Sequence, residues 1–518
     1  MTGGAGGAVP AGAPELQGRT LAGNTAWSIL GQLPPLVLAA VAIPPLVHGL
    51  GEERFGVLGL VWVVLGVFGA FDLGMSRATT RAFAERRALG DEDGAEAVAW
   101  TSAAAQLGLG LVTGGVLAAG SGVLAGRLLA VPPSLAPEAA AAFALVGLAI
   151  PLVLVGNALR GVLEGGGRFD SVAWARGPLG SLTFLLPLLG MWAGLGLPGI
   201  TALLAGGRAL GVWVHLALCR RAWPGRFVTP RLAWGELRGL ARFGAWVAVS
   251  SSIIPLLLYL DRFLLASLAS LAAVAYYTVP YEGMTRILLV PAGVAAVIFP
   301  AFTSVAARGG GAALGQGLAG ATRGVAVMMT PAVLIVVILA DRILEVWLGA
   351  PFPEQSTMAL RLLAGATFLH ALGYAPLALL EGSGRPDVVA RYHVLEFPVY
   401  ATVAAFCIVR WGVTGAALAW LLRMAWMVPI FFVLCTRFAG LRPGSVLRGA
   451  TGRALAAGGL ALSLAAVAAS LDVSLGAQIL ILGTLGSAWA TAAWRWGFEA
   501  GDRALIRGYL SARKTHHA

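Results

Sequence analysis

Two arginines lie near the middle of long apolar runs of this sequence, where an ionisable side chain is costly. Arg208 lies in the run 197–219 and Arg423 in the run 413–435, 215 positions later. On insertion scales a charge at this depth costs about 2.5 to 3.5 kcal/mol or more, so it usually faces a cavity or a partner. A guanidinium offers forked donors to phosphate oxygens, so both arginines are candidate ligands of an anionic substrate. The alternative is that each pairs with a carboxylate or carbonyl of its own half.

Four further charges also lie within apolar runs. Arg286 follows Glu282 by four residues, which places both on one helix face and favours an ion pair over substrate binding by Arg286. Asp261 and Arg262 are neighbours, and adjacent helical residues point about 100° apart, so we expect them not to pair with each other. Asp261 is a candidate protonation or cation site for coupling, and a structural ion pair is the alternative.

An eight-residue motif occurs twice and organises the chain. Residues 163–170 read Leu-Glu-Gly-Gly-Gly-Arg-Phe-Asp and residues 380–387 read Leu-Glu-Gly-Ser-Gly-Arg-Pro-Asp, with six identical positions at an offset of 217. Glycine adopts positive φ cheaply, so both copies predict helix-to-helix turns. Cys219 and Cys435, 216 positions apart, extend the match and indicate a duplicated unit. Three arginines flank the turns and are candidates for capturing anionic headgroups, with topogenic charge as the alternative: Arg160, Arg176 and Arg391.

The composition is that of a membrane protein. Of 518 residues, 58% are hydrophobic and only 12% are charged, against about a quarter in soluble proteins, and the mean hydropathy is +0.83. Apolar runs of about 20 residues, long enough to cross a hydrocarbon layer of about 30 Å, recur along the chain. The net charge of +12 is spread over short turns, which favours basic loops at a membrane and argues against nucleic acid as a partner.

These runs predict an all-α polytopic membrane protein with about fourteen transmembrane helices, in two pseudo-symmetric six-helix lobes plus two C-terminal helices. We expect a disordered tail (1–19), an N-terminal lobe (20–220), a basic cytoplasmic linker (221–243), a C-terminal lobe (244–437), the two extra helices (438–496) and a cytoplasmic tail (497–518). The predicted spans are 24–48, 55–75, 97–119, 138–160, 172–193, 197–219, 244–265, 272–300, 317–340, 358–379, 389–409, 413–435, 452–471 and 475–495.

The basic residues predict the orientation. With the N-terminus inside, 27 of the 36 lysines and arginines fall in cytoplasmic segments and five in outer segments. Because loops rich in positive charge stay inside, this bias predicts that both termini are cytoplasmic.

No catalytic, metal-binding or cofactor-binding arrangement emerges. The single lysine, Lys514, lies in the tail, so the chain has no phosphate-binding loop of the Gly-x-x-x-x-Gly-Lys type. The three cysteines lie in apolar runs and indicate neither a disulfide framework nor a metal site. No outer loop exceeds about twenty residues, which is short for an envelope polymerase or ligase. We therefore expect no enzyme, no cofactor and no metal.

Several segments carry a family resemblance: residues 24–32, 50–56, 71–77, 260–263 and 275–277. The region 20–440 resembles the polysaccharide-transport branch of the multidrug/oligosaccharidyl-lipid/polysaccharide (MOP) exporter superfamily, the Wzx-type flippases. The resemblance implies two six-helix lobes around a central cavity. It also implies that the Asp261–Arg262 pair lies at the interface between the lobes.

The same resemblance implies a function in surface polysaccharide biosynthesis. A flippase of this type moves an undecaprenyl-diphosphate-linked oligosaccharide from the inner to the outer leaflet of the bacterial cytoplasmic membrane by alternating access. Its partners would be that lipid-linked oligosaccharide, membrane lipids and the envelope polymerase machinery. The alternatives are a multidrug or cation antiporter of the same superfamily, a peptidoglycan-precursor flippase and, from another class, an envelope polymerase or ligase.

Overall fold

The computed structural model describes residues 33–70, 74–233, 235, 253–307, 310–438, 444, 446–471 and 473–497. All regular elements in these ranges are helical. Nine of the described helices are long and apolar enough to cross a membrane. The predicted tails, and the part of the predicted linker from residue 236 to residue 243, lie outside the described residues.

The described part of the first half contains seven α-helices. They are α2 (Leu33–Leu50), α3 (Glu52–Ala70), α4 (Met75–Ala88), α5 (Glu92–Val123), α6 (Ala136–Gly165), α7 (Phe169–Trp192) and α8 (Leu197–Ala222), and a π-helical turn, η1 (Leu124–Leu128), extends α5. The sequence analysis did not predict α4, because this helix is too short and too polar to read as a span. Its buried side chains, such as Phe83, pack against α5 and α6.

The second half contains a helix over 253–268, then α10 (Leu271–Ile287), α11 (Leu289–Ala307), α12 (Gly311–Leu348), α13 (Phe352–Gly382) and α14 (Pro386–Phe438). The predicted single span 272–300 is wrong in one respect, since it breaks at Leu288 into α10 and α11. The break has a local cause. Pro291 has no N–H to donate to the carbonyl of Ile287, so the helical ladder is interrupted there.

The long helix α14 is a hairpin of two limbs. Gly412 has φ +53°, and the chain reverses there. A Cβ on Gly415 would lie 2.0 Å from the carbonyl oxygen of Cys407, so the two limbs approach closely and glycine is required at the contact. The limbs match the two predicted spans 389–409 and 413–435. Two further helices follow, α15 (Gly449–Ala469) and α16 (Leu475–Ala492). The π-helical turn η2 (Ala493–Gly497) extends α16.

The two copies of the glycine motif adopt the same turn. Gly167 and Gly384 have φ +73° and +75°, and each ends a helix. The N–H of Arg168 donates to the carbonyl of Leu163 at 2.8 Å, and the N–H of Arg385 donates to that of Leu380 at 3.0 Å. This six-to-one hydrogen bond beside a left-handed glycine is the Schellman ending of a helix. The prediction of paired helix-to-helix turns is confirmed.

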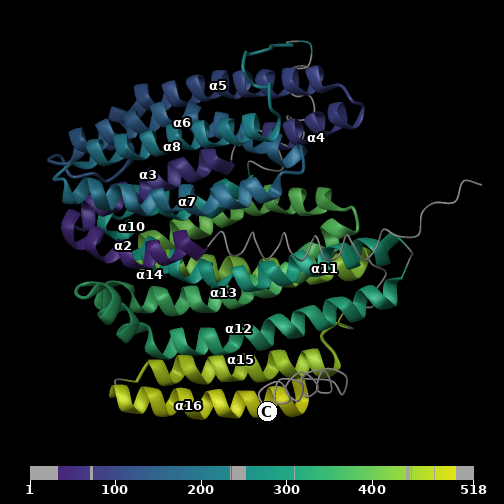
Figure 1. Cartoon of the computed structure of the whole chain (residues 1–518). Coiled ribbons are helices and arrows are strands. Elements are labelled where there is room, and N and C mark those ends of the chain that lie inside the picture. The colour runs from purple at the N-terminus through teal and green to yellow at the C-terminus, as the bar shows by residue number, and fades with distance from the viewer. Residues whose placement is uncertain are drawn as a thin grey trace, which may run out of the picture.

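A pair of cysteine contacts repeats in the same way. The thiol of Cys219 donates to the carbonyl of Leu159 at 3.8 Å, and that of Cys435 donates to the carbonyl of Pro376 at 3.0 Å. Equivalent positions of the two halves therefore make equivalent helix contacts. Helices of the first half lie together in one part of the bundle, those of the second half in the other, and α15 and α16 pack outside α12 (Figure 1).

Two ends of the bundle are distinguished by their turns. The arginine-rich end carries the turns 89–91, 166–168 and 383–385 and the segment 223–233. The opposite end carries the turns 129–135, 193–196, 269–270 and 349–351.

Candidate functional site

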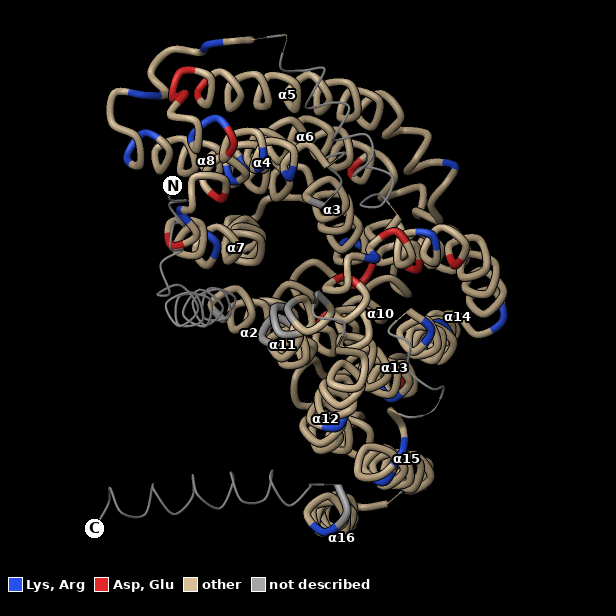
Figure 2. Tube along the Cα trace, turned by 90° about the vertical axis from the view of Figure 1, so that its right-hand side faces the viewer, with Lys and Arg blue, Asp and Glu red and all other residues tan. Residues whose placement is uncertain are grey.

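A cavity of about 440 Å³ lies between the two halves of the bundle. Its walls come from α2, α3, α6, α7 and α8 of the first half and from α10 and the helix 253–268 of the second half. Figure 2 shows these helices from the arginine-rich end. Among the described residues, six charged side chains line the cavity and only one of them is acidic: Arg160, Arg176, Arg208, Arg262, Arg286 and Glu282.

Arg208 differs from the cavity arginines of the ion-pair type, because its described contacts include no carboxylate. It lies midway along α8, where its Nη2 donates a long hydrogen bond of 3.4 Å to Thr183 Oγ1 on α7. Its Nε is buried without an acceptor among the described residues, and no described carboxylate forms an ion pair with it. The guanidinium therefore brings an uncompensated positive charge to the cavity wall.

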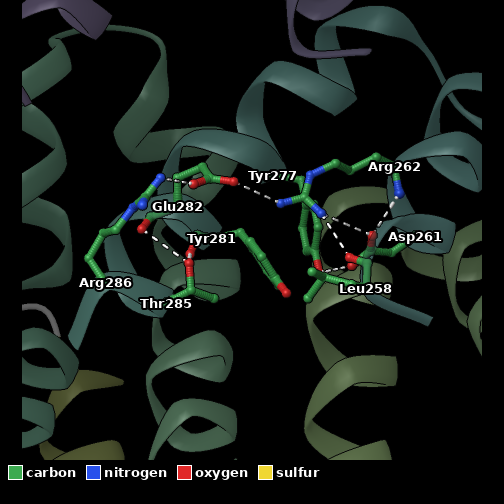
Figure 3. Close-up of polar contacts among 8 residues, drawn as sticks. All are labelled: Leu258, Asp261, Arg262, Tyr277, Tyr281, Glu282, Thr285 and Arg286. Atoms are coloured by element: carbon green, nitrogen blue, oxygen red, sulfur yellow. Dashed lines mark hydrogen bonds and ion pairs between the residues drawn. The ribbon is translucent and has the colours of Figure 1, made fainter. Parts of the chain in front are cut away.

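A ladder of ion pairs joins the helix 253–268 to α10 (Figure 3). Arg286 Nη2 lies 2.8 Å from Glu282 Oε2, and Arg262 Nη2 lies 3.3 Å from Glu282 Oε1. Arg262 Nη1 lies 3.5 Å from Asp261 Oδ1. The predicted ion pair of Arg286 with Glu282 is confirmed.

The prediction that Asp261 and Arg262 do not pair is wrong. The Arg262 side chain folds back over the preceding turn, and its Nη1 donates to the carbonyl of Leu258 at 3.0 Å. The Asp261 side chain stays close to the backbone of Arg262, and its Oδ1 accepts the N–H of Arg262 at 2.8 Å. The 100° between adjacent residues separates their Cβ directions, but a long guanidinium side chain spans that angle.

This ladder is electrically balanced, and its Asp261–Arg262 end is deeply buried. Asp261 and Arg262 are 1% and 0% exposed, Tyr277 donates a hydrogen bond to Asp261, and Arg262 lies 4.2 Å above the ring of Tyr281. Two arginines face two carboxylates, so the ladder contributes no net charge to the cavity. Its contacts hold the helix 253–268 on α10.

Arg423 lies in a different environment from Arg208. Its Nε and Nη2 contact the two carboxylate oxygens of Glu396, each at 3.1 Å, and its Nη1 donates to the carbonyl of Leu257 at 3.2 Å. Tyr400 lies below the guanidinium at 4.9 Å, and His393 Nδ1 lies 2.9 Å from Glu396. Arg423 does not line the cavity. Arg423 therefore pairs with a carboxylate of its own half, which was the alternative to substrate binding. Glu396 was not predicted from the sequence, although a carboxylate within an apolar span was itself a signal.

The three arginines that flank the glycine turns separate into two groups. Arg160 and Arg176 line the cavity. Arg391 does not; its side chain is 75% exposed and its Nη2 lies 2.6 Å from Asp387 Oδ2. The structure therefore brings two of the three proposed headgroup ligands together with Arg208.

A second cavity, of about 450 Å³, adjoins the first at the arginine-rich end. Gly69 and Arg160 line both. Arg77 and Glu164 of the first half and Glu381 of the second half line the second cavity. Glu164 and Glu381 occupy the same position in the two glycine motifs, and the sequence analysis gave neither a role. The repeat itself could have identified them, because it places two carboxylates at equivalent helix ends.

At the opposite end the two halves are in direct contact. Trp347 Nε1 of α12 donates to the carbonyl of Ala40 in α2 at 2.8 Å, and the N–H of Ala130 donates to the carbonyl of Ala266 at 2.7 Å. Gly56 of α3 lies against Leu271, where an added Cβ would be 2.1 Å from the carbonyl oxygen. The halves therefore close this end, whereas cavities separate them toward the arginine-rich end.

The family assignment follows from a comparison with known proteins. Residues 21–306, more than half of the chain, match the family described as Polysaccharide biosynthesis protein. The chain belongs to this family. A relative from Shigella flexneri, named "Putative O-antigen transporter", is 23% identical over 406 residues, which are 77% of this chain and 94% of the relative.

Solved structures show the same fold. An inward-facing multidrug resistance MATE family transporter of the MOP superfamily superposes with a TM-score of 0.69 at 18% identity, covering 80% of this chain and 98% of that one. An outward-facing structure of a MATE family transporter superposes with a TM-score of 0.60 at 17% identity, covering 82% and 96%. The predicted fold class, an all-α multi-span membrane protein, is confirmed.

Proposed function

We propose that this chain is a flippase for an undecaprenyl-diphosphate-linked oligosaccharide in polysaccharide biosynthesis. Membership of the Polysaccharide biosynthesis protein family and the likeness to the "Putative O-antigen transporter" support this proposal. The observation that carries it is the charge of the central cavity, where five arginines and a single glutamate form the charged lining among the described residues.

The charge balance of the cavity favours an anionic substrate. Glu282 is shared between Arg262 and Arg286, and Asp261 supplies the second negative charge of that ladder. Arg208 remains without a described carboxylate, and Arg160 Nε is 3.7 Å from Glu164, beyond hydrogen-bond distance. A diphosphate that leaves water to cross the bilayer needs fixed cations along its path, and forked guanidinium donors match its oxygens.

Alternating access fits the contrast between the two ends of the bundle. The opposite end is closed by direct contacts between the halves, and the cavities lie toward the arginine-rich end. The excess of basic residues assigns the arginine-rich end to the cytoplasm. In this orientation the structure corresponds to the state that loads substrate from the inner leaflet, with Arg160 and Arg176 meeting the headgroup before Arg208.

The orientation is tested by labelling a single added cysteine. Val228 lies in the segment 223–233 and is 66% exposed. In intact cells, Val228→Cys should be shielded from an impermeant thiol reagent and should react once the membrane is permeabilised. Labelling of intact cells would reverse the proposed direction of transport.

The function itself is tested with purified protein in liposomes. We expect translocation of a fluorescent undecaprenyl-diphosphate-linked oligosaccharide, loss of translocation in Arg208→Glu, and unchanged translocation in Arg410→Ala, an exposed arginine outside the cavity. Two parallel assays, with a lipophilic cation and with the peptidoglycan precursor, distinguish the alternatives. Transport of the cation alone would identify an antiporter, and transport of the precursor alone would identify a peptidoglycan-precursor flippase.

A further inference from the structure

Five buried polar atoms on the cavity wall have no hydrogen-bond partner among the described residues: Arg160 Nε, Arg208 Nε, Arg262 Nε, Trp62 Nε1 and Thr278 Oγ1. Arg160 and Arg262 form ion pairs with Glu164 and Glu282, which leaves Arg208, Trp62 and Thr278 as the three without a described carboxylate. An unpaired buried donor costs about 1 to 3 kcal/mol, and native structures rarely retain one without a reason. Three such groups in one cavity indicate a ligand rich in hydrogen-bond acceptors.

Among the described residues, Thr278 and Thr367 differ in this respect from the other buried threonines, and only Thr278 of the two lines the cavity. The hydroxyls of Thr201, Thr322 and Thr330 each donate to the carbonyl four residues earlier in their own helix, at 2.7 to 2.8 Å. Thr278 is only 4% exposed and makes no such bond. Its hydroxyl lies beside Gly59, where an added Cβ would be 3.9 Å away.

The three groups form one continuous wall. Gly59 and Trp62 are three residues apart on α3 and therefore share a helix face. Trp62 packs edge-on against Phe184 with ring centroids 5.3 Å apart, and Phe184 follows Thr183, which accepts the hydrogen bond of Arg208. The wall thus runs from α10 across α3 to α7 and α8.

The wall lies deeper in the cavity than the other arginines of the first half. Arg160 is five residues from the end of α6 at the arginine-rich end, whereas Thr278 is seven residues from the start of α10 at the opposite end. A lipid-linked sugar keeps its diphosphate next to the membrane-embedded lipid, so its glycan extends farther into the cavity. Hydroxyl and carbonyl oxygens of a sugar supply the missing acceptors.

We propose that Trp62 and Thr278, beside Arg208, form a subsite for the sugar that is attached to the diphosphate. This inference rests on the proposed function. Arg160 and Arg176 would contact mainly the diphosphate, whereas Trp62 and Thr278 determine specificity for the glycan. The indole supplies one N–H and an apolar ring, and the threonine supplies a hydroxyl, which are groups that orient a ligand in a mostly apolar pocket.

The test uses two substitutions that remove a polar group: Thr278→Val, which keeps the shape, and Trp62→Phe, which keeps an aromatic ring of smaller size. Purified full-length protein in lipid nanodiscs is titrated with undecaprenyl diphosphate and with the same lipid carrying an oligosaccharide. Each variant should weaken binding of the sugar-bearing lipid about three- to tenfold, the effect of one lost hydrogen bond, and leave binding of the sugarless lipid unchanged.

Thermal unfolding separates this role from a structural one. In Thr278→Val, removal of an unpaired buried hydroxyl should leave Tm unchanged or raise it. Trp62→Phe also loses ring volume, so a moderate fall in its Tm is expected from packing alone. A fall in Tm in Thr278→Val would show that its hydroxyl supports the fold and would overturn the subsite. Equal loss of affinity for both lipids, or no loss for either, would overturn it as well.

Matched controls are available elsewhere in the chain. Trp192→Phe replaces an exposed tryptophan outside the cavity, and Thr322→Val removes a hydroxyl bonded within its own helix. Neither should change the ratio of the two affinities. Failure of the wild-type protein to bind either lipid would contradict the proposed function itself. If the wild-type protein binds both lipids and the two variants bind them with the same affinities, only the sugar subsite is contradicted.

Discussion

Arg208 and Arg423 occupy nearly equivalent positions in the two halves, yet their environments are opposite. Arg423 has both oxygens of Glu396 and the carbonyl of Leu257 as acceptors. Arg208 has one long hydrogen bond to Thr183 and lines the cavity. The two halves therefore use an arginine in this part of the helix differently: Arg423 is neutralised within its own half, and Arg208 lies on the cavity wall.

The difference can be traced to two positions that follow the repeated turn. At the offset of 217, Leu179 corresponds to Glu396 and Thr183 corresponds to Tyr400. Glu396 neutralises Arg423 and Tyr400 lies beneath it. Leu179 has no charge, and Thr183 offers a single weak acceptor. We therefore expect the residues at these two positions to determine whether the nearby arginine is neutralised within its own half.

Breaking the ion pair of Arg423 with Glu396 should give the largest effect. Arg423→Ala leaves the carboxylate of Glu396, whose side chain is 0% exposed, buried without a cation. Removal of one partner of a buried pair costs about 3 to 5 kcal/mol, so we expect most of the folded protein to be lost. The measurement is the yield of monodisperse protein in detergent, together with its Tm.

A double substitution provides the control for this loss. Arg423→Met with Glu396→Leu replaces the whole pair by apolar groups and should recover much of the Tm. A stable, well-folded Arg423→Ala protein would show instead that the pair does not support the fold.

Removing the cavity cation should spare the fold and impair function. Arg208→Ala should reduce affinity for the diphosphate lipid about 10- to 100-fold, the effect of one charge-assisted contact, with Tm retained. Arg208→Lys should restore the affinity in part, because lysine keeps the charge and loses the fork. Binding is measured with purified variants in nanodiscs, and export is measured as surface glycan in cells that express the same variants. Normal export by a folded Arg208→Ala protein would remove Arg208 from the mechanism.

The comparison can also be sharpened by making one half resemble the other. Leu179 lies beside Gly211, one turn from Arg208, with 3.9 Å between its Cδ1 and a Cβ built on that glycine. Leu179→Glu should supply the missing carboxylate and weaken binding of the diphosphate lipid about tenfold through the lost free cation. Leu179→Gln, which adds polarity without charge, should have a much smaller effect. Equal losses in the two variants would show that shape rather than charge is responsible.

The smallest effect concerns the caps of two corresponding helices. Asp91 begins α5, and its carboxylate accepts the N–H of Gly94 at 2.8 Å, whereas Gly310 begins α12 without a side-chain cap. The Gly94 N–H, followed by the hydrogen bond from Arg86, holds the pKa of Asp91 below its ordinary value of 3.8. A lowered pKa gives stability that is present above the ordinary value and is lost as the pH falls through the lowered one.

We therefore expect the first turn of α5 to lose protection from hydrogen exchange as the pH falls below 3.8, while the first turn of α12 does not respond. Exchange rates corrected for the intrinsic pH dependence measure this difference. Asp91→Asn should abolish it, and a persistent response in that variant would assign the pH dependence to another group.

The sequence by itself determined the features that depend on neighbours along the chain. Apolar runs predicted the spans, because crossing a hydrocarbon layer requires about 20 such residues. The positive-φ glycines of the two turns and the ion pair of Arg286 with Glu282 are local geometry, within one helical turn. Pro291, which ends α10, was equally readable but was overlooked because hydropathy does not change at Leu288.

Only the tertiary structure decided which charges are neutralised. Glu396 meets Arg423 because α14 reverses at Gly412, which brings together residues 27 positions apart. Arg208 has no carboxylate partner among the described residues, because the facing turn of α7 carries Leu179 and Thr183. An apolar span predicts that a charge within it needs a partner or a cavity, but not which of the two, since that depends on the helices packed around it.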